Sequence, residues 1–342
     1  MPDYAEAGVD LEAAAKAVEL IGILARSATR PEVVEGVGGF AGLFRISEGR
    51  LLACAADGVG TKTEIARLAG RLDTVGIDLV AMCADDVACT GAEPLLFLDY
   101  IASGMVVPEE IAALVEGVAE GCRRAGCALL GGETAEHPGV MDPGRFDLAG
   151  FCVGVVDEDA MLGAHRVREG DVLIGLASTG LHSNGYSLVR RILIDSGSFR
   201  LDDTPPELGG RTLAGELLEP TAVYAPTVVE LARRGLISAA AHVTGGGIPE
   251  NLARVLPHGV GAELDPGSWS RLPVFDLIQR VGGLSDGAMR EAFNLGLGMI
   301  LVVPSGSVQE TIEITGRAGH SPHVVGRVAR PGGVRMDNLG SS

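Results

Sequence analysis

The order of apolar and polar residues divides the first half of the chain into short helices and strands. Apolar residues recur at helical spacing in four segments, at residues 11–26, 63–69, 75–90 and 108–125. Five strand-length segments are predicted at residues 40–46, 51–56, 94–101, 128–130 and 147–156. Residues 47–50 turn the first two strands into a hairpin. Alternation of this kind, without a long helical repeat, is typical of a mixed α/β (α+β) protein.

A second set of elements follows a charged segment at residues 157–171. Its strands are predicted at 172–177, 299–303 and 324–328, and its helices at 186–196, 221–234, 249–255 and 308–318. A length of 342 residues exceeds one usual core, so we predict two domains, at residues 1–160 and 165–330. Residues 198–210 predict a surface loop, and residues 331–342 a tail without regular structure.

The predicted helix at 75–90 is apolar on almost every side, which is typical of a buried helix, yet it contains Asp78, Asp85 and Asp86. An ionised carboxylate buried without a partner costs on the order of several kcal/mol. A divalent cation would satisfy these acids economically. The alternative is that one aspartate caps a helix end or faces water, and that interpretation fits Asp78 better than Asp86.

A glycine-rich segment, Asp57-Gly58-Val59-Gly60-Thr61-Lys62, follows the apolar run at 51–56. Its lysine is one of two in a chain with 27 basic residues. The glycines let the backbone approach a polyphosphate, the carboxylate can hold Mg²⁺, and the ammonium can meet phosphate oxygens. The pattern matches neither the Walker A nor the Rossmann motif, and a plain glycine-rich turn is the alternative.

A second acidic segment, residues 131–139, follows the apolar run at 127–130 and contains Glu133, Thr134 and Glu136. We expect a strand to end there in a loop, and ligands of α/β proteins bind at such loops. For Glu136 a solvated acidic turn is an equal alternative.

Two segments of the second half each follow an apolar run and open a predicted helix. The amides, hydroxyls and imidazoles of such segments can converge on an anion. Their candidate residues are His182, Ser183, Asn184 and Gly185 in the first, and His242, Thr244, Gly245 and Gly246 in the second. The alternative for each histidine is a neutral ring bonded to the backbone. Glycines in residues 293–299 predict a strand that another backbone approaches closely.

Composition narrows the class of protein. A net charge of −18 argues against nucleic acid or an anionic membrane as a partner. The six cysteines show no C-x-x-C spacing, so small buried apolar roles are expected and no disulfide framework is implied. Uncharged apolar runs stay below 18 residues and the N-terminal segment is acidic, so we expect a cytoplasmic protein.

Residues 4–328 resemble the phosphoribosylformylglycinamidine cyclo-ligase (AIR synthetase) family. The resemblance is carried by motifs that occur in order along the chain: AGVD at 7–10, RPEV at 30–33, GGF at 38–40, DGVGTK at 57–62, GIDLVAMC at 76–83, GAEPL at 91–95, FLDY at 97–100, AEGC at 119–122, GGETAEHPG at 131–139, LHSNGYSLVR at 181–190 and TGGG at 244–247.

The resemblance implies an ATP-dependent ring closure in purine synthesis. In this family ATP phosphorylates the formyl amide oxygen of formylglycinamidine ribonucleotide, an amidine nitrogen attacks the activated carbon, and phosphate leaves to give aminoimidazole ribonucleotide. It also implies Mg²⁺, commonly K⁺, and a homodimer whose N-terminal strands join into a barrel between subunits. The first domain would then bind ATP and dimerise, and the second would bind substrate.

Carried over by position, the resemblance implies a role for each candidate residue. The catalytic set would be Asp57, Lys62, Asp86, Glu133 and His182, with the carboxylates Asp57, Asp86 and Glu133 as metal ligands. ATP contacts would be Gly38, Gly39, Phe40, Gly58, Gly60, Thr61, Lys62 and Thr134, and the two second-half segments would bind the substrate. The alternatives are another ATP-dependent enzyme of the same superfamily and a non-catalytic nucleotide-binding homologue.

Overall fold

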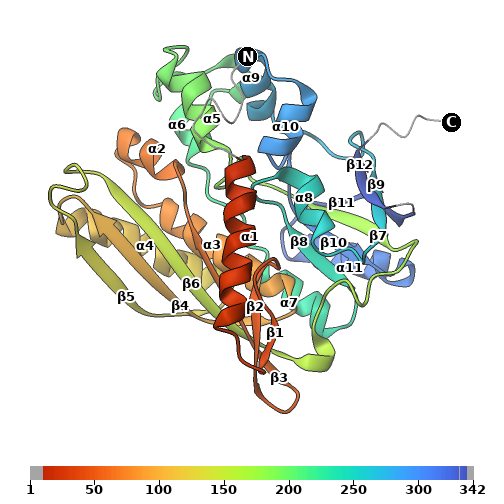
Figure 1. The fold of residues 1–342 in the computed structure, drawn as a ribbon. Coiled ribbons are helices and arrows are strands. Elements are labelled where there is room, and N and C mark those ends of the chain that lie inside the picture. The colour runs from red at the N-terminus through yellow and green to blue at the C-terminus, as the bar shows by residue number, and fades with distance from the viewer. Residues whose placement is uncertain (1–10, 331, 337–342) are drawn as a thin grey trace.

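The computed structural model describes residues 11–330 and 332–336. Within them, the first domain contains a sheet of six strands in the order β1-β2-β3-β6-β4-β5 (Figure 1). Neighbouring strands are antiparallel except for β4 and β5. The strands are β1 (Val33–Glu35), β2 (Gly42–Ser47), β3 (Arg50–Gly58), β4 (Glu93–Ser103), β5 (Ala128–Glu136) and β6 (Phe146–Asp157).

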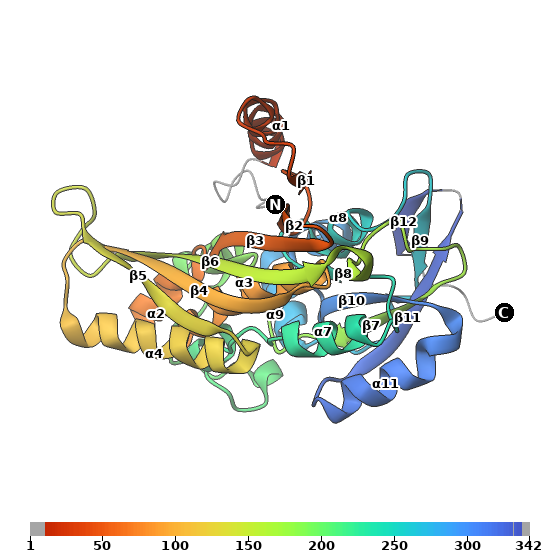
Figure 2. The same ribbon diagram turned by 90° about the horizontal axis from the view of Figure 1, so that it is seen from below.

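Helices cover one face of this sheet. α2 (Lys62–Ala69), α3 (Val75–Cys89) and α4 (Pro108–Ala125) lie on the same side of it, whereas α1 (Leu11–Ser27) stands away from the body (Figure 2). α3 and α4 pack with their backbones in close approach, because a Cβ at Gly76 would overlap Val118 N on α4. The sheet and these two helices therefore enclose the first core and fix the position of α3.

The second domain is built on another mixed sheet. Among the described residues it has six strands in the order β12-β9-β11-β7-β10-β8. The strands are β7 (Val172–Ala177), β8 (Ala239–His242), β9 (Gly261–Leu264), β10 (Leu297–Val303), β11 (Pro322–Ala329) and β12 (Gly333–Met336). The helices are α5 (Tyr186–Val189), which continues as a π-helical stretch at Arg190–Asp195, α6 (Leu213–Leu217), α7 (Ala225–Arg233), α8 (Gly247–Ala253), α9 (Pro273–Gly282), α10 (Asp286–Ala292) and α11 (Val308–Arg317).

The two-domain mixed α/β fold predicted from the sequence is confirmed, with two corrections. Residues 131–136 are not a loop, because β5 continues to Glu136 beside β4. The predicted tail is wrong for Gly333–Met336, which form β12 and pair with β9; the remaining tail residues, 331 and 337–342, lie outside the described residues. None of the described helices is long and apolar enough to cross a membrane.

Helix α3 joins the two domains. It packs on the first sheet and also contacts α7 and β8 of the second domain. Its side chains are buried almost throughout, as the sequence predicted. Because α3 carries three aspartates into this interface, the acids of the first domain face loops of the second.

Candidate functional site

Three of the predicted loops converge where the domains meet. The first follows β3 and leads into α2, and its Thr61 Oγ1 lies 2.9 Å from Ser187 Oγ on α5. The second loop joins β7 to α5, and the third joins β8 to α8. Asn184 of the second loop lies beside Gly245 of the third, because a Cβ at Gly245 would be 3.5 Å from Asn184 Oδ1. Strand–loop–helix connections of both domains thus form one site.

Two carboxylates of the first domain reach this site. Asp86, on α3, accepts a hydrogen bond from His242 Nδ1 at 2.9 Å, and its side chain is 17% exposed. Asp57 Oδ1, at the end of β3, accepts from the amide of Gly58 at 2.7 Å. Burial, and to a smaller extent the charge of Asp86, raise the pKa of Asp57 to about 6 although the Gly58 hydrogen bond and His242 lower it. A cation at these acids would relieve that cost.

His242 is fully buried at the end of β8. Burial lowers its pKa, but the hydrogen bond and charge of Asp86 outweigh burial, and the net pKa is raised. Its other ring nitrogen, Nε2, is buried and has no hydrogen-bond partner among the described residues. Asp86 therefore orients the ring, whose Nε2 accepts a hydrogen bond when the imidazole is neutral and donates one when it is protonated.

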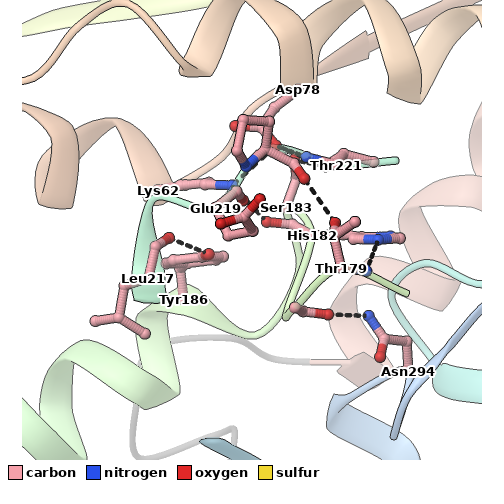
Figure 3. Close-up of polar contacts among 12 residues, drawn as sticks. Lys62, Asp78, Thr179, His182, Ser183, Tyr186, Leu217, Glu219, Thr221 and Asn294 are labelled. Atoms are coloured by element: carbon pink, nitrogen blue, oxygen red, sulfur yellow. Dashed lines mark hydrogen bonds and ion pairs between the residues drawn. The ribbon is translucent and has the colours of Figure 1, made fainter. Parts of the chain in front are cut away.

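His182 adopts a left-handed backbone conformation, with φ of 61°. Its Nε2 accepts a hydrogen bond from the amide of Thr179 at 3.2 Å, which places the ring proton on Nδ1 (Figure 3). Burial, followed by the charges of His242 and Lys62, holds the pKa of His182 well below its ordinary value. The ring is neutral, and its Nδ1 is buried without a partner in the described part of the chain.

The His182 loop is held in place by Asn294. Asn294 Nδ2 donates to the carbonyl of Gly180 at 3.0 Å (Figure 3). Asn294 Oδ1 accepts from Ser178 Oγ at 3.1 Å. The sequence predicted a close approach of backbone near this segment. It is found at Gly296, where a Cβ would be 2.9 Å from the carbonyl oxygen of Ser270, whereas Gly298, on β10, makes room for the ring of His182 and the hydroxyl of Tyr224.

The third loop is fastened by Asn251 on α8. Asn251 Nδ2 donates to the carbonyls of Gly245 and Gly247, and its Oδ1 accepts from Thr244 Oγ1 at 3.2 Å. Thr244 therefore holds the loop, through its hydroxyl and through its carbonyl, which accepts from the amide of Gly247 at 3.1 Å. At Gly247, which has φ of 65°, a Cβ would overlap the carbonyl of Arg290.

The prediction that Lys62 contacts nucleotide phosphate is corrected by its contacts. Lys62 is fully buried, and Nζ donates to Asp78 Oδ1 at 2.8 Å and to the carbonyls of His182 and Glu219 at 3.0 and 2.7 Å (Figure 3). An ammonium has three N–H donors, and all three are used inside the protein. Burial lowers the pKa of Lys62 and raises that of Asp78, while their attraction opposes both shifts.

The other buried aspartates of α3 also bond to the second domain. Asp78 Oδ1 accepts from the amide and hydroxyl of Thr221 at 2.7 and 2.6 Å, so it neither caps its own helix nor faces water. Asp85 Oδ1 accepts from the amides of Tyr224 and Ala225 at the start of α7. Burial raises the pKa of Asp85 to about 7 despite these bonds. Sequence reasoning missed Thr221 and Tyr224.

Glu133 and Thr134 do not join the other candidates within one chain. In the sheet register, Asp57, Gly150, Asp99 and Gly132 form one row across β3, β6, β4 and β5. Neighbours in a row share a face, so Glu133, the next residue, points to the opposite face and lies three strands from Asp57. No three His, Cys, Asp or Glu side chains of the described residues are grouped to hold a metal. The predicted three-carboxylate set is therefore wrong for the single chain.

Gly38, Gly39 and Phe40 line a pocket of about 560 Å³ together with Cys54, Ala55 and Ala56, which directly precede Asp57. Arg254 of the second domain stacks on the Phe40 ring, 5.3 Å from its centroid. This glycine segment thus lies against the part of β3 that leads into the first loop of the site.

Comparison with known proteins identifies the family. The sequence models for the AIR synthase related protein N-terminal and C-terminal domains match residues 38–156 and 168–337. The phosphoribosylformylglycinamidine cyclo-ligases of Symbiobacterium thermophilum and of a Synechococcus species are each 49% identical to this chain. The first match covers 97% of both chains, and the second 97% of this chain and 98% of the relative.

Solved structures with the same fold are more distant in sequence. Thiamine-monophosphate kinase of Stenotrophomonas maltophilia superposes with a TM-score of 0.63 at 20% identity, over 94% of this chain and 96% of that one. AaThiL complexed with AMPPCP and TMP gives 0.64 at 16% identity, over 93% and 92%. T. maritima PurL complexed with FGAR gives 0.60 at 17% identity, over 89% of this chain and 46% of that one. At such identities these likenesses show the fold alone.

Proposed function

The chain belongs to the phosphoribosylformylglycinamidine cyclo-ligase family of purine-synthesis ligases, and we propose that its interdomain site closes the imidazole ring of formylglycinamidine ribonucleotide at the expense of ATP. One observation carries this assignment to the site. His182 Nδ1, Asn184 Nδ2 and His242 Nε2 are buried polar atoms without partners among the described residues, and they come from the two converging loops of the second domain. Buried polar groups are normally paired, so a polar ligand is expected there.

Asp57 and Asp86 would receive the nucleotide side of the reaction. Mg²⁺ is commonly held by one or two protein carboxylates together with substrate phosphates, and this pair fits that donor set. Bound there, Mg²⁺ would neutralise phosphate charge during phosphoryl transfer. The amide of Gly60 would contact phosphate oxygens, whereas that of Gly58 already donates to Asp57, and the Gly38–Phe40 segment would border the nucleotide.

The second-domain loops would bind and orient the ribonucleotide. Neutral His182 and Asn184 offer N–H donors without charge. His242, held by Asp86, offers Nε2 as an acceptor when the ring is neutral and as a donor when it is protonated, and the interaction with Asp86 favours the protonated form. Glycine amides at the start of α8 suit the ribose phosphate. The chemistry requires no protein nucleophile, because the amidine nitrogen attacks within the same substrate once its formyl oxygen carries phosphate. Orientation and charge stabilisation are the contributions of the chain.

An ADP-release assay tests the proposed function directly. We expect ADP formation that requires both Mg²⁺ and formylglycinamidine ribonucleotide, with aminoimidazole ribonucleotide formed in equal amount. Thiamine monophosphate is the informative alternative substrate, because a protein of the same fold is named thiamine-monophosphate kinase. ADP release that follows thiamine monophosphate and ignores the amidine would overturn the proposal, and tight ATP binding without turnover would favour the non-catalytic homologue.

Replacement of His182 should separate substrate binding from ATP binding. We expect His182→Ala to lower kcat/KM for the ribonucleotide by about 10²-fold, as loss of one preorganised donor does, with the Kd for ATP little changed. His182→Asn is the matched control, because asparagine tolerates the left-handed backbone and removes only the imidazole. Equal losses of ATP and substrate binding in both variants would contradict the division between the domains.

We also propose that the chain works as a homodimer formed through the first sheet. The face of this sheet opposite α3 and α4 carries no helix layer (Figure 2). Apolar side chains stand exposed on it or at its edge, including Phe151, Leu95 and Leu130 at 44%, 44% and 65%. An apolar face of this extent is normally covered, and the family implies a second copy as the cover. Glu133 lies on the same face, so dimerisation would place it at the subunit boundary.

A charge on this face should separate the subunits. We expect Phe151→Asp to shift the sedimentation coefficient from dimer to monomer at micromolar concentration, because an aspartate buried in an apolar interface lacks a partner. Val324→Asp is the matched control, since Val324 is 48% exposed on β11 of the second domain. A wild-type chain that sediments as an active monomer would contradict the dimer.

A further inference from the structure

Three cysteines gather where α4 ends and β5 begins, away from the interdomain site. Cys122 lies in the last turn of α4, Cys127 directly precedes β5, and Cys152 lies on β6. Cys122 and Cys152 are buried, whereas Cys127 is partly exposed. Both of the other thiols lie near enough to Cys127 to lower the pKa of its thiol. The sequence analysis expected each cysteine to be a separate buried apolar residue, so this cluster has no role in the fold or reaction described above.

The end of α4 explains why two of these thiols meet. Gly126 follows the helix in the left-handed conformation, with φ of 75°, and the amide of Cys127 donates to the carbonyl of Cys122 at 3.0 Å. This is the long hydrogen bond of a Schellman motif, in which the side chains at the two bonded positions come into contact. The local sequence Cys-x-x-x-Gly-Cys therefore holds Cys122 and Cys127 together without help from distant residues.

The surroundings favour a thiolate on the exposed member of the cluster. Hydrogen bonds from Cys122 and then Cys152 lower the pKa of Cys127, while burial opposes them. The same hydrogen bonds, with burial, raise the pKa values of Cys122 and Cys152. A thiolate that is reachable from solvent and supported by thiol donors is the reactive form of cysteine.

We propose that Cys127 and Cys122 are a peroxide-sensitive thiol pair that closes to a disulfide. The Cys127 thiolate attacks a hydroperoxide oxygen, the O–O bond breaks, and hydroxide or alkoxide leaves with a sulfenic acid formed on Cys127. The Cys122 sulfur then attacks the Cys127 sulfur, the S–O bond breaks, and water leaves with the Cys122 proton. The thiols lose two electrons and the peroxide gains them. Cys122 is assigned as the resolving thiol because the Schellman hydrogen bond holds it beside Cys127, whereas Cys152 comes from β6, which β4 separates from β5.

Mass spectrometry of the full-length protein tests the pair. The folded chain is treated with a stoichiometric amount of hydrogen peroxide, blocked with N-ethylmaleimide and digested with trypsin and Glu-C. Cleavage after Glu120, Arg123 and Arg124 separates the two cysteines, so a disulfide joins two peptides. We expect that linked species, with the loss of two hydrogens and reversal by dithiothreitol.

Variants identify the role of each sulfur. Cys127→Ser should abolish the linked species, because it removes one of the two sulfurs, and should slow the oxidation of Cys122 by peroxide at least about tenfold relative to that of the wild-type pair, because it removes the thiolate. Cys122→Ala should leave a dimedone-reactive sulfenic acid at Cys127. Cys54→Ser removes a thiol from the opposite face of the sheet and should leave the linkage unchanged. A Cys127–Cys152 linkage, or wild-type protein that shows no linkage while another cysteine is oxidised, would overturn the proposal, and the wild-type result does not depend on how the variants fold.

Discussion

Asp57→Asn is expected to lower kcat/KM for ATP by about 10³-fold while the protein still folds. Asparagine keeps the shape of the side chain and an oxygen that can accept the Gly58 amide, as Asp57 Oδ1 does at 2.7 Å. It removes one of the two negative charges proposed for Mg²⁺-ATP. Steady-state ADP release at several Mg²⁺ concentrations measures the loss, and unchanged kcat/KM at limiting Mg²⁺ would remove Asp57 from the nucleotide site.

The same variant should change how stability depends on pH. Burial raises the folded pKa of Asp57 to about 6, above an unfolded value of about 4, so the folded chain binds the extra proton between these values. The contribution of Asp57 to the free energy of unfolding should therefore be greatest below about pH 4 and decline by up to about 3 kcal/mol as pH rises through 6. Asp57→Asn should remove this part of the decline, leaving the similar contribution of Asp85, whose pKa is raised to about 7.

Mg²⁺ gives a readout that is independent of activity. Because a bound cation favours the ionised carboxylate, we expect Mg²⁺ with a non-hydrolysed ATP analogue to raise the Tm of the wild type more at pH 8 than at pH 5, and to raise that of Asp57→Asn less. Asp99→Asn is the matched control. Asp99 shares the row and face of Asp57, and burial raises its pKa too, but it lies two strands away. If Asp57→Asn and Asp99→Asn lose the Mg²⁺-dependent rise in Tm to the same extent, the loss comes from removing any buried charge and Asp57 is not a specific Mg²⁺ ligand.

Much of the fold could be predicted because its signals are local. The prediction for α4 matches its observed bounds, since Pro108 opens the helix and Gly126 ends it in the left-handed conformation. β7 also matches, as a continuous apolar run before a loop. β5 was predicted too short because Gly131 and Gly132 resemble a loop. A Cβ at Gly132 would overlap Asp99 on β4, so this glycine marks a close approach within the sheet.

The site was predicted less well than the fold because its partners are distant in sequence. The loops themselves follow from strand–loop–helix patterns, and they do meet. Whether a polar side chain faces a ligand or another residue depends on tertiary contacts. Lys62 lies 16 residues from Asp78, but 120 and 157 from the other groups that it bonds, which belong to the second domain. Glu133 was misplaced for a related reason. The face of the sheet to which its side chain points depends on how β5 pairs with β4, and that pairing cannot be read from the local sequence.

One signal in the sequence could have corrected the assignment of Lys62. The same reasoning that required a partner for the buried acids of α3 also applied to the lysine near them. Asp78 needed a cation, and Lys62 was the nearest ammonium. Pairing them in advance would have predicted a structural ion pair at the interface and left Asp57 and Asp86 as the acids available for a metal.

Lys62→Met is expected to lower the free energy of unfolding by about 3–5 kcal/mol, because it leaves the Asp78 carboxylate buried without its counter-ion. It also removes donors from the carbonyls of His182 and Glu219, which tie the second domain to the first. Calorimetry should show a lower Tm, with the interface between the domains weakened. The Kd for ATP, measured at a temperature where the variant is folded, should change little. Loss of a phosphate-binding lysine would instead weaken ATP binding.

The double variant Lys62→Met/Asp78→Asn separates the two explanations. Asparagine at position 78 can still accept hydrogen bonds from the amide and hydroxyl of Thr221, as Asp78 does. It carries no charge that would be left without a counter-ion. If the cost of Lys62→Met is the unpaired carboxylate, the double variant should recover most of the lost stability, which a double-mutant cycle quantifies as a coupling energy of at least about 2 kcal/mol. A Lys62→Met protein of wild-type stability that binds ATP at least tenfold more weakly would return the ammonium to the phosphate site.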